Sequence, residues 1–218
     1  MPASPLFALL KKDVLLEWRQ KHTLFGVLLY AGSTVFVIYT MAGRPDAAMW
    51  NVLFWMTQLF IAVNSVAKSF LGEPQERFRY YYTLVKPATF LSAKFIYSIL
   101  LMLLMGTLAL GLFALLLGTP LEQAGLFVIV AITGAISLSS IFTFLSAIAA
   151  RAGQNATLMA ILGFPLITPI LMILSRLALK AISPVYQAGW WKLGLTLLGT
   201  DALVIVVGII LFPFLWQE

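Results

Sequence analysis

Hydrophobic residues are gathered into long runs that short polar stretches separate. A helix needs about 20 apolar residues to cross a hydrocarbon core about 30 Å thick. Runs of this length recur along the whole chain, and no soluble domain fits between them. The pattern predicts an all-α integral membrane protein, a single domain over 1–218 with six transmembrane helices at about 24–42, 50–67, 95–118, 124–150, 155–175 and 193–216.

The composition supports this prediction and narrows the chemistry. The chain is 61% hydrophobic and 10% charged, whereas about 25% of the residues of a soluble domain are charged. Too few polar residues are present to cover a water-exposed surface, so we expect the lipid bilayer to cover most of the protein. The absence of cysteine and the single histidine exclude disulfides, thiolate metal sites and a histidine-ligated metal cluster.

The cations predict the orientation in the membrane. The net charge is +6, but the lysines and arginines lie in gaps between apolar runs instead of along one stripe, so we expect no nucleic-acid partner. Ten of the 14 fall on one side of the predicted topology, and cytoplasmic loops collect such residues. Both termini and the 68–94 segment are therefore predicted to be cytoplasmic.

The first residues, 1–23, are predicted to form an interfacial helix on the cytoplasmic leaflet. Four apolar residues share one side at helical spacing, with Lys12 on another side. The alternative is a charged leader to the first span. The apolar side consists of Phe7, Leu10, Val14 and Trp18.

A short charged helix is predicted over 72–87. Gly72 breaks the preceding span, Pro74 suits a first helical position, and Pro87 is expected to stop the helix. A rigid cytoplasmic helix between two spans is what a membrane subunit needs if a soluble motor is to push on it; the alternative is a solvated loop anchored by aromatic rings. The candidate motor contacts are Glu73, Glu76, Arg77, Arg79, Tyr80, Tyr81 and Tyr82.

Two features inside the spans suggest a transport pathway or a conformational element. The span that starts near Asn155 contains Pro165 and Pro169, which predict a break or kink, and broken spans often line pathways. Asp201 is an acid within the last predicted span, where a carboxylate is costly and often functional. Its place near the predicted start of that span favours the alternative, an interfacial cap.

Small residues recur at every fourth position of the 124–150 span, and such a face lets helices approach closely in lipid. We expect it to pack within the chain; packing against a second copy is the alternative. The face consists of Ala131, Ala135, Ser139, Thr143 and Ala147.

No motif for catalysis occurs in the sequence. There is no Gly-x-x-x-x-Gly-Lys-Ser/Thr phosphate loop, no HExxH and no GxSxG. We therefore expect the chain not to be an enzyme. An active transporter built on it needs a separate ATPase subunit to bind ATP.

Three segments carry a resemblance to a known family. They are Leu6–Arg19, the stretch Phe70–Pro87 with its Tyr-Tyr-Tyr-Thr-Leu-Val run and the following Lys94, and Asn155–Pro169. Together they resemble the CcmB family (haem exporter protein B), the ABC-2 type permease subunits of the cytochrome c maturation system. Many members read Phe-x-x-Asp-x-x-Asp-Gly-x-Leu-Glu in the cytoplasmic loop, where this chain reads Phe-Leu-Gly-Glu-Pro-Gln-Glu-Arg-Phe, a departure that bears on ATPase docking.

The resemblance implies a multi-pass permease in the bacterial cytoplasmic (inner) membrane. Its implied partners are an ABC ATPase subunit (CcmA) that binds ATP, a haem-handling membrane subunit (CcmC), a small single-span subunit (CcmD), a haem chaperone (CcmE) and a second copy of the permease. It would couple ATP hydrolysis to haem export or to release of the haem-loaded chaperone.

Haem is expected as cargo and not as a bound cofactor. Haem iron is usually held by His, Cys, Met or Tyr, and this chain has no Cys and one His. A mechanical relay therefore fits the residues better than haem ligation. The alternatives are an ABC-2 type permease that exports another lipid-like or glycan substrate, and an ATPase-free membrane assembly factor.

Overall fold

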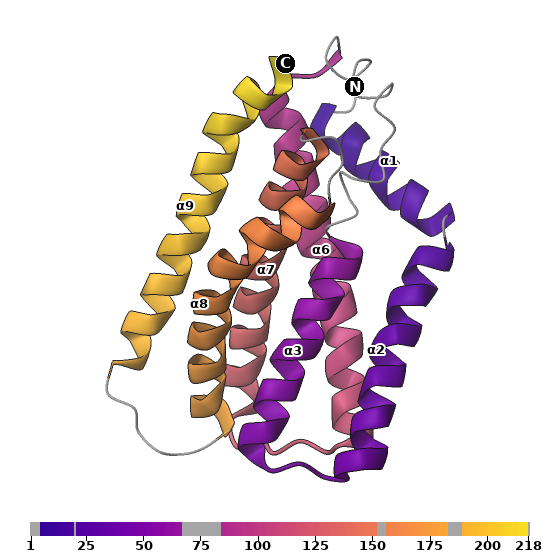
Figure 1. The fold of residues 1–218 in the computed structure, drawn as a ribbon, viewed down its shortest axis with the longest axis vertical. Helices are drawn as coiled ribbons and strands as arrows, with labels where there is room; N and C mark the ends of the chain where they lie inside the picture. Colours follow the sequence, from indigo (N-terminus) through magenta and orange to yellow (C-terminus); the bar gives the residue numbers. More distant parts are fainter. Residues whose placement is uncertain (1–4, 20, 67–83, 152–155, 183–188, 218) are drawn as a thin grey trace.

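The computed structural model describes residues 5–19, 21–66, 84–151, 156–182 and 189–217. Within these ranges the regular structure is entirely helical, which confirms the predicted all-α class. The helices are α1 (Pro5–Arg19), α2 (Lys21–Ala42), α3 (Ala47–Ser65), α6 (Pro87–Leu116), α7 (Ala124–Arg151), α8 (Ala156–Ile182) and α9 (Trp190–Gln217) (Figure 1).

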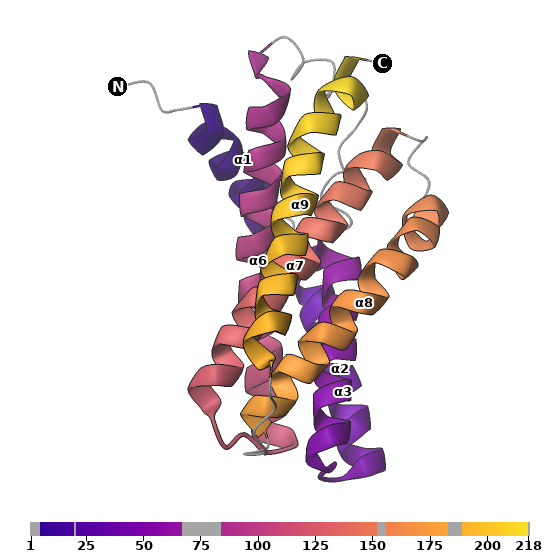
Figure 2. The same ribbon diagram turned by 90° about the vertical axis from the view of Figure 1, so that its left-hand side faces the viewer.

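The helices from α2 to α9 run lengthwise, and α1 crosses one end of the bundle (Figures 1 and 2). The last turns of α9 lie at this same end, which we call the α1 end. The connections from α2 to α3 and from α6 to α7 lie at the opposite end. α6 contacts α1, α2, α3, α7 and α9, and α7 contacts α3, α6, α8 and α9, so these two helices form the centre of the bundle.

Five helices are long and apolar enough to cross a membrane: Ala47–Ser65, Pro87–Leu116, Ala124–Ala150, Ile161–Ile182 and Trp190–Phe214. Large apolar side chains such as Leu29, Leu115 and Phe164 point outward and are more than 70% exposed, as expected where lipid covers the surface. The apolar part of α2, Phe25–Met41, is shorter. The integral membrane class is confirmed, and the sixth span stays a prediction.

An aromatic cluster joins α3, α6 and α7 near the opposite end. The ring of Trp50 is fully buried and lies 5.4 Å from the centroids of Phe113 and of Phe127, with edge-to-face geometry. Its indole N–H donates to the carbonyl of Gly118 at 3.0 Å, just beyond the end of α6. Each such ring pair adds about 1 kcal/mol beyond simple burial, so this cluster fixes the relative positions of the three helices.

The small residues of α7 pack inside the chain. Ala135, Ser139, Thr143 and Ala147 are buried in the single copy and Ala131 is partly buried against the core, which confirms the expected intrachain packing. Close approach also explains Gly134, because a Cβ atom there would clash with the Trp55 ring.

Two sequence-based expectations about prolines hold only in part. Leu84 is helical and Val85 and Lys86 are not, so a helix ends before Pro87 as expected, but Pro87 also begins α6. Proline suits this first position because its missing N–H would have no intrahelical partner there. As a result α6 begins eight residues before the predicted start at 95, and Lys94 lies within it. The rest of the predicted 72–87 helix lies outside the described residues, except Leu84.

The second expectation, a break or kink, concerns α8, which stays helical from Ala156 to Ile182 through Pro165 and Pro169. The helix changes direction along its length (Figure 1), so it is kinked as predicted but not broken. Lipid offers no alternative partners to a freed backbone, so the remaining intrahelical hydrogen bonds keep the segment helical.

Candidate functional site

A polar contact between α1 and α6 lies at the α1 end. The Lys94 Nζ atom is 3.3 Å from both carboxylate oxygens of Asp13, and the two residues are 3% and 6% exposed. The Nζ atom of Lys12 approaches the same carboxylate to 3.0 Å. Asp13 therefore has two cations around it in a buried position.

A second contact between α1 and α6 lies one helical turn from the Asp13–Lys94 ion pair. The Tyr97 hydroxyl donates to the Glu17 carboxyl at 2.7 Å. Asp13 and Glu17 stand four apart on α1, and Lys94 and Tyr97 stand three apart on α6, so each pair shares one helix face. We call Asp13, Glu17, Lys94 and Tyr97 the α1–α6 joint.

The joint extends to the last helix. Lys94 Nζ lies 5.8 Å from the centroid of the Phe90 ring, and Phe90 stacks on Phe212 of α9 at 6.3 Å and an angle of 9°. Three helices that are distant in sequence therefore meet around this lysine. Removing one partner of a buried ion pair costs about 3 to 5 kcal/mol, so this contact holds α1 firmly against α6.

The outward side of α1 carries large apolar side chains beside exposed cations. Phe7, Val14 and Trp18 are 59%, 49% and 70% exposed, while Asp13 on the other side is buried. This orientation suits a helix that lies in the membrane interface with its apolar side toward lipid. Leu10, predicted on the same side, differs because it is partly buried against the core.

Asp201 lies deep in the bundle. It stands eleven residues after Trp190, the first residue of α9, and is 5% exposed. The Ser137 hydroxyl on α7 donates to its Oδ2 atom at 2.7 Å. The interfacial cap is therefore wrong, because Trp190–Lys192 belong to α9 and move its start away from Asp201. The acid joins α7 to α9.

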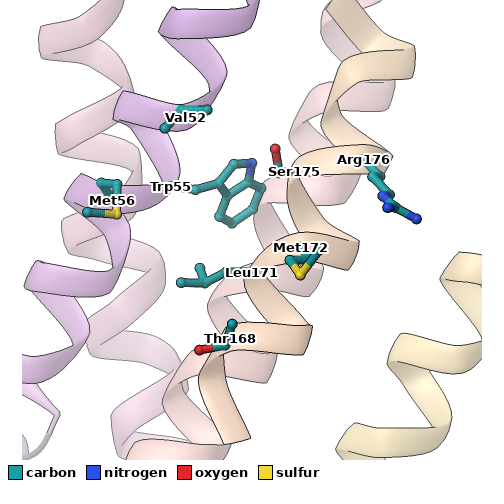
Figure 3. A pocket seen from close by; sticks show the side chains of 8 residues that line it. All are labelled: Val52, Trp55, Met56, Thr168, Leu171, Met172, Ser175 and Arg176. Atoms are coloured by element: carbon teal, nitrogen blue, oxygen red, sulfur yellow. The ribbon is translucent and has the colours of Figure 1, made fainter. Parts of the chain in front are cut away.

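An apolar groove separates α3 and α8 (Figure 3). Its volume is about 350 Å³, and Trp55 projects into it from α3 while the Arg176 side chain points away from that ring. The Asn51 amide ties the two helices together, because it donates to the carbonyl and to the hydroxyl of Ser175 at 2.9 and 3.0 Å. The groove is lined by Val52, Trp55, Met56, Thr168, Leu171, Met172, Ser175 and Arg176.

The structure brings the predicted site residues together only in part. Pro165 and Pro169 lie in α8, whereas the hydrogen bond of Asp201 goes to α7. Asn155 and the predicted motor contacts lie outside the described residues. The latter are Glu73, Glu76, Arg77, Arg79, Tyr80, Tyr81 and Tyr82.

Sequence reasoning missed the α1–α6 joint. The hydropathy pattern places Lys94 in a loop, where no partner inside the protein is expected. The spacing of Asp13 and Glu17 amid apolar and basic residues was the available signal. Within the described ranges there is no group of three or more His, Cys, Asp or Glu residues that could hold a metal ion.

Apolar helices of this length, with polar contacts buried between them, define a multi-spanning integral membrane protein. The family model of the CcmB protein matches residues 4–215, nearly the entire chain. The chain belongs to the CcmB family, the permease subunits of the haem exporter in cytochrome c biogenesis, as the sequence resemblance predicted. Comparison with curated proteins and with solved structures gave no match.

Proposed function

We propose that this permease subunit couples ATP hydrolysis by a partner ATPase to haem export or to release of the haem-loaded chaperone. The partner subunit binds and hydrolyses ATP, and the permease converts its movement into a rearrangement of the spans. Family membership over residues 4–215 supports the permease role. The observation that carries the coupling is the buried Asp13–Lys94 ion pair.

The position of α6 makes it the element that transmits movement. It begins at Pro87, directly after the segment that holds the proposed ATPase contacts, and it contacts α1, α2, α3, α7 and α9. A helix is stiff along its axis because each turn is hydrogen-bonded to the next. A displacement of its first turn therefore reaches every helix that it contacts.

The joint decides how far α1 follows this movement. With the ion pair closed, α1 and α6 move as one body, and the apolar side of α1 stays in the membrane interface. With it open, two cations and a carboxylate need water or new partners. A coupling element needs such discrete arrangements, because a continuously deformable contact would absorb the movement.

In the proposed assembly the α1 end faces the cytoplasm, and both termini lie there. The ATPase subunit contacts Glu73, Glu76, Arg77, Arg79, Tyr80, Tyr81 and Tyr82, and the haem-handling subunit, the small single-span subunit and the haem chaperone receive the rearrangement. A second permease copy would give each ATPase its own contact. Asn155, Pro165, Pro169 and Asp201 are the proposed conformational residues.

Charge reversal tests the ATPase contact. In Arg77→Glu/Arg79→Glu we expect loss of ATPase co-purification with the tagged permease and loss of cytochrome c assembly. Arg44→Glu, at the opposite end of the bundle, is the matched control and should keep both. A double variant with normal ATPase binding and normal cytochrome levels would contradict the docking proposal.

Identification of the co-purified proteins separates the alternatives. An ATPase together with haem-handling subunits supports the proposed complex, and an ATPase together with glycan enzymes would point to another substrate. Recovery without any ATPase would favour an assembly factor. Stoichiometric haem binding by the purified chain, with a defined axial-ligand spectrum, would replace the relay with direct haem transfer.

A further inference from the structure

One oxygen of the buried Asp201 carboxyl has no partner. Oδ2 accepts a hydrogen bond from Ser137, whereas Oδ1 contacts no donor among the described residues. The residue is 5% exposed in a bundle whose outer surface is apolar. An ionised carboxylate in such surroundings is strongly disfavoured unless a cation or several donors compensate it.

No cation compensates it from the neighbouring helices α6 and α7. On α6 the charged residue is Lys94, which is bound to Asp13. The next residue, Phe95, packs beside Gly208 of α9, where its ring lies 3.3 Å from a Cβ built on the glycine. Gly208 is seven residues, or about 10 Å of helix, from Asp201.

The other charged or titratable groups on the helices packed against α9 also lie elsewhere. Those of α8 and α9 gather at the opposite end, where the Trp190 indole donates to the Leu177 carbonyl at 3.4 Å. The groups of α8 and α9 are Arg176, next to Leu177, and Lys180 and Lys192, over the rings of Trp190 and Trp191. On α6, Tyr97 is bound to Glu17, and on α7 the remaining charged residue is Arg151, the last residue of that helix.

Two buried hydroxyls on α6 and α7, the helices packed beside α9, have no hydrogen-bond partner among the described residues. Ser140 of α7 stands three residues, about 4.5 Å, beyond Ser137. Ser98 of α6 stands three residues beyond Phe95, and because α6 runs antiparallel to α9, this step leads from Gly208 toward Asp201. Both hydroxyls are fully buried and without a hydrogen bond among the described residues.

Serine hydroxyls can pair with either form of the acid, because each can donate to an ionised Oδ1 and can accept from a protonated one. Only the protonated form leaves no uncompensated charge in these apolar surroundings. A buried water needs two to four polar partners, so a water that reached Asp201, Ser140 and Ser98 would satisfy them without a counter-ion.

We propose that Asp201 is a proton-binding site in the interior of the permease. Its carboxyl is neutral when α7 and α9 are packed, with the O–H on Oδ1 directed to the hydroxyls of Ser140 and Ser98, directly or through water. Separation of α7 from α9 admits water and releases the proton. This site depends on the packing of three spans and not on the ATPase, so it goes beyond the proposed function.

Infrared spectroscopy of the complete complex in lipid nanodiscs tests the protonation. At neutral pH we expect a carboxylic-acid C=O band in the wild type that disappears in Asp201→Asn and persists in Asp46→Asn, the matched change of an exposed aspartate. A spectrum with carboxylate bands only would overturn the proposal. A carboxylate band that shifts between sodium and potassium buffers would assign the site to a metal cation instead.

Variants that retain the acid keep the test valid if Asp201→Asn does not assemble. Ser137→Ala removes the hydrogen bond to Oδ2 and should shift the C=O band, while Ser98→Ala and Ser140→Ala should change its sensitivity to deuterium exchange. An acid band that none of these variants alters would show that the proton lies on another residue. Normal cytochrome assembly beside either result would leave the coupling proposal unaffected.

Discussion

Asp13 and Asp201 are equally buried, at 6% and 5% exposure, but their surroundings differ. Asp13 lies at the α1 end with the Nζ atoms of Lys12 and Lys94 within 3.3 Å. Asp201 lies in the middle of α9 with a hydroxyl as its hydrogen-bond partner. Burial alone therefore does not define the role of a membrane carboxyl; the presence of a cation does.

The difference follows from depth. Near the ends of the spans the buried Asp13 has two lysines within reach, and the Lys12 side chain is partly exposed, so an ion pair is tolerated there. In the hydrocarbon region burying a second charge is as unfavourable as burying the first, so a neutral hydroxyl is a more favourable partner for the carboxyl. The first arrangement holds two helices together through charge, and the second holds them through a hydrogen bond that a proton can control.

The largest effect is expected when the ion pair loses its buried cation. Lys94→Met keeps the volume of the stem but leaves Asp13 with Lys12 alone, so the free energy of unfolding should fall by about 3 kcal/mol. The permease level in membranes and the thermal stability of the purified complex measure this loss. Lys86→Met, an exposed lysine at the start of α6, should leave both unchanged.

The double variant Asp13→Asn/Lys94→Met separates charge from packing. If the ion pair matters through charge, neutralising both partners should recover part of the stability lost in Lys94→Met, because no uncompensated carboxylate then remains. A double variant as unstable as the sum of the two single variants would mean that the partners do not interact energetically.

A smaller effect is expected from the second contact of the joint. Tyr97→Phe removes the hydroxyl that donates to Glu17 at 2.7 Å and keeps the ring, so we expect a loss of about 1.5 kcal/mol. Tyr39→Phe, on an exposed ring of α2, is the matched control. Chemical-denaturant or thermal unfolding of both variants gives the comparison, and equal stabilities would remove Tyr97 from the joint.

Apolar runs predicted the lengthwise helices to within a few residues at most of their ends, because lipid leaves the backbone no alternative to helix. The ends themselves were harder. Pro87 can stop one helix or start the next, and the choice depends on Lys86 being extended. The first residue of α9 decides whether Asp201 is a cap or an interior acid. The sequence of Trp190–Lys192 does not show that these residues already belong to the helix.

Contacts distant in sequence could not be predicted from patterns. Asp13 and Lys94 stand 81 positions apart, and their meeting depends on how α1 folds back over α6. The hydropathy criterion that locates the spans assigns a lysine at a span boundary to a loop. The α1–α6 joint therefore could not be predicted from it. The spacing of Asp13 and Glu17 shows a face but not its partner.

The smallest change in stability is expected at Asp201, and there the dependence on pH gives the sharper test. Asn can still accept the hydrogen bond from Ser137, so Asp201→Asn should cost less than about 1 kcal/mol at neutral pH. In the wild type the folded state keeps the proton, whereas the unfolded carboxyl gives it up to water. The folded state then binds more protons, and stability falls as pH rises.

Asp201→Asn should flatten this dependence and lower haem delivery if proton release accompanies the rearrangement. Thermal unfolding across neutral and alkaline pH measures the first effect, with Asp46→Asn as control. Parallel pH profiles of the wild type and Asp201→Asn would show that Asp201 is charged in the bundle, as Asp13 is, and would remove the contrast between the two carboxyls.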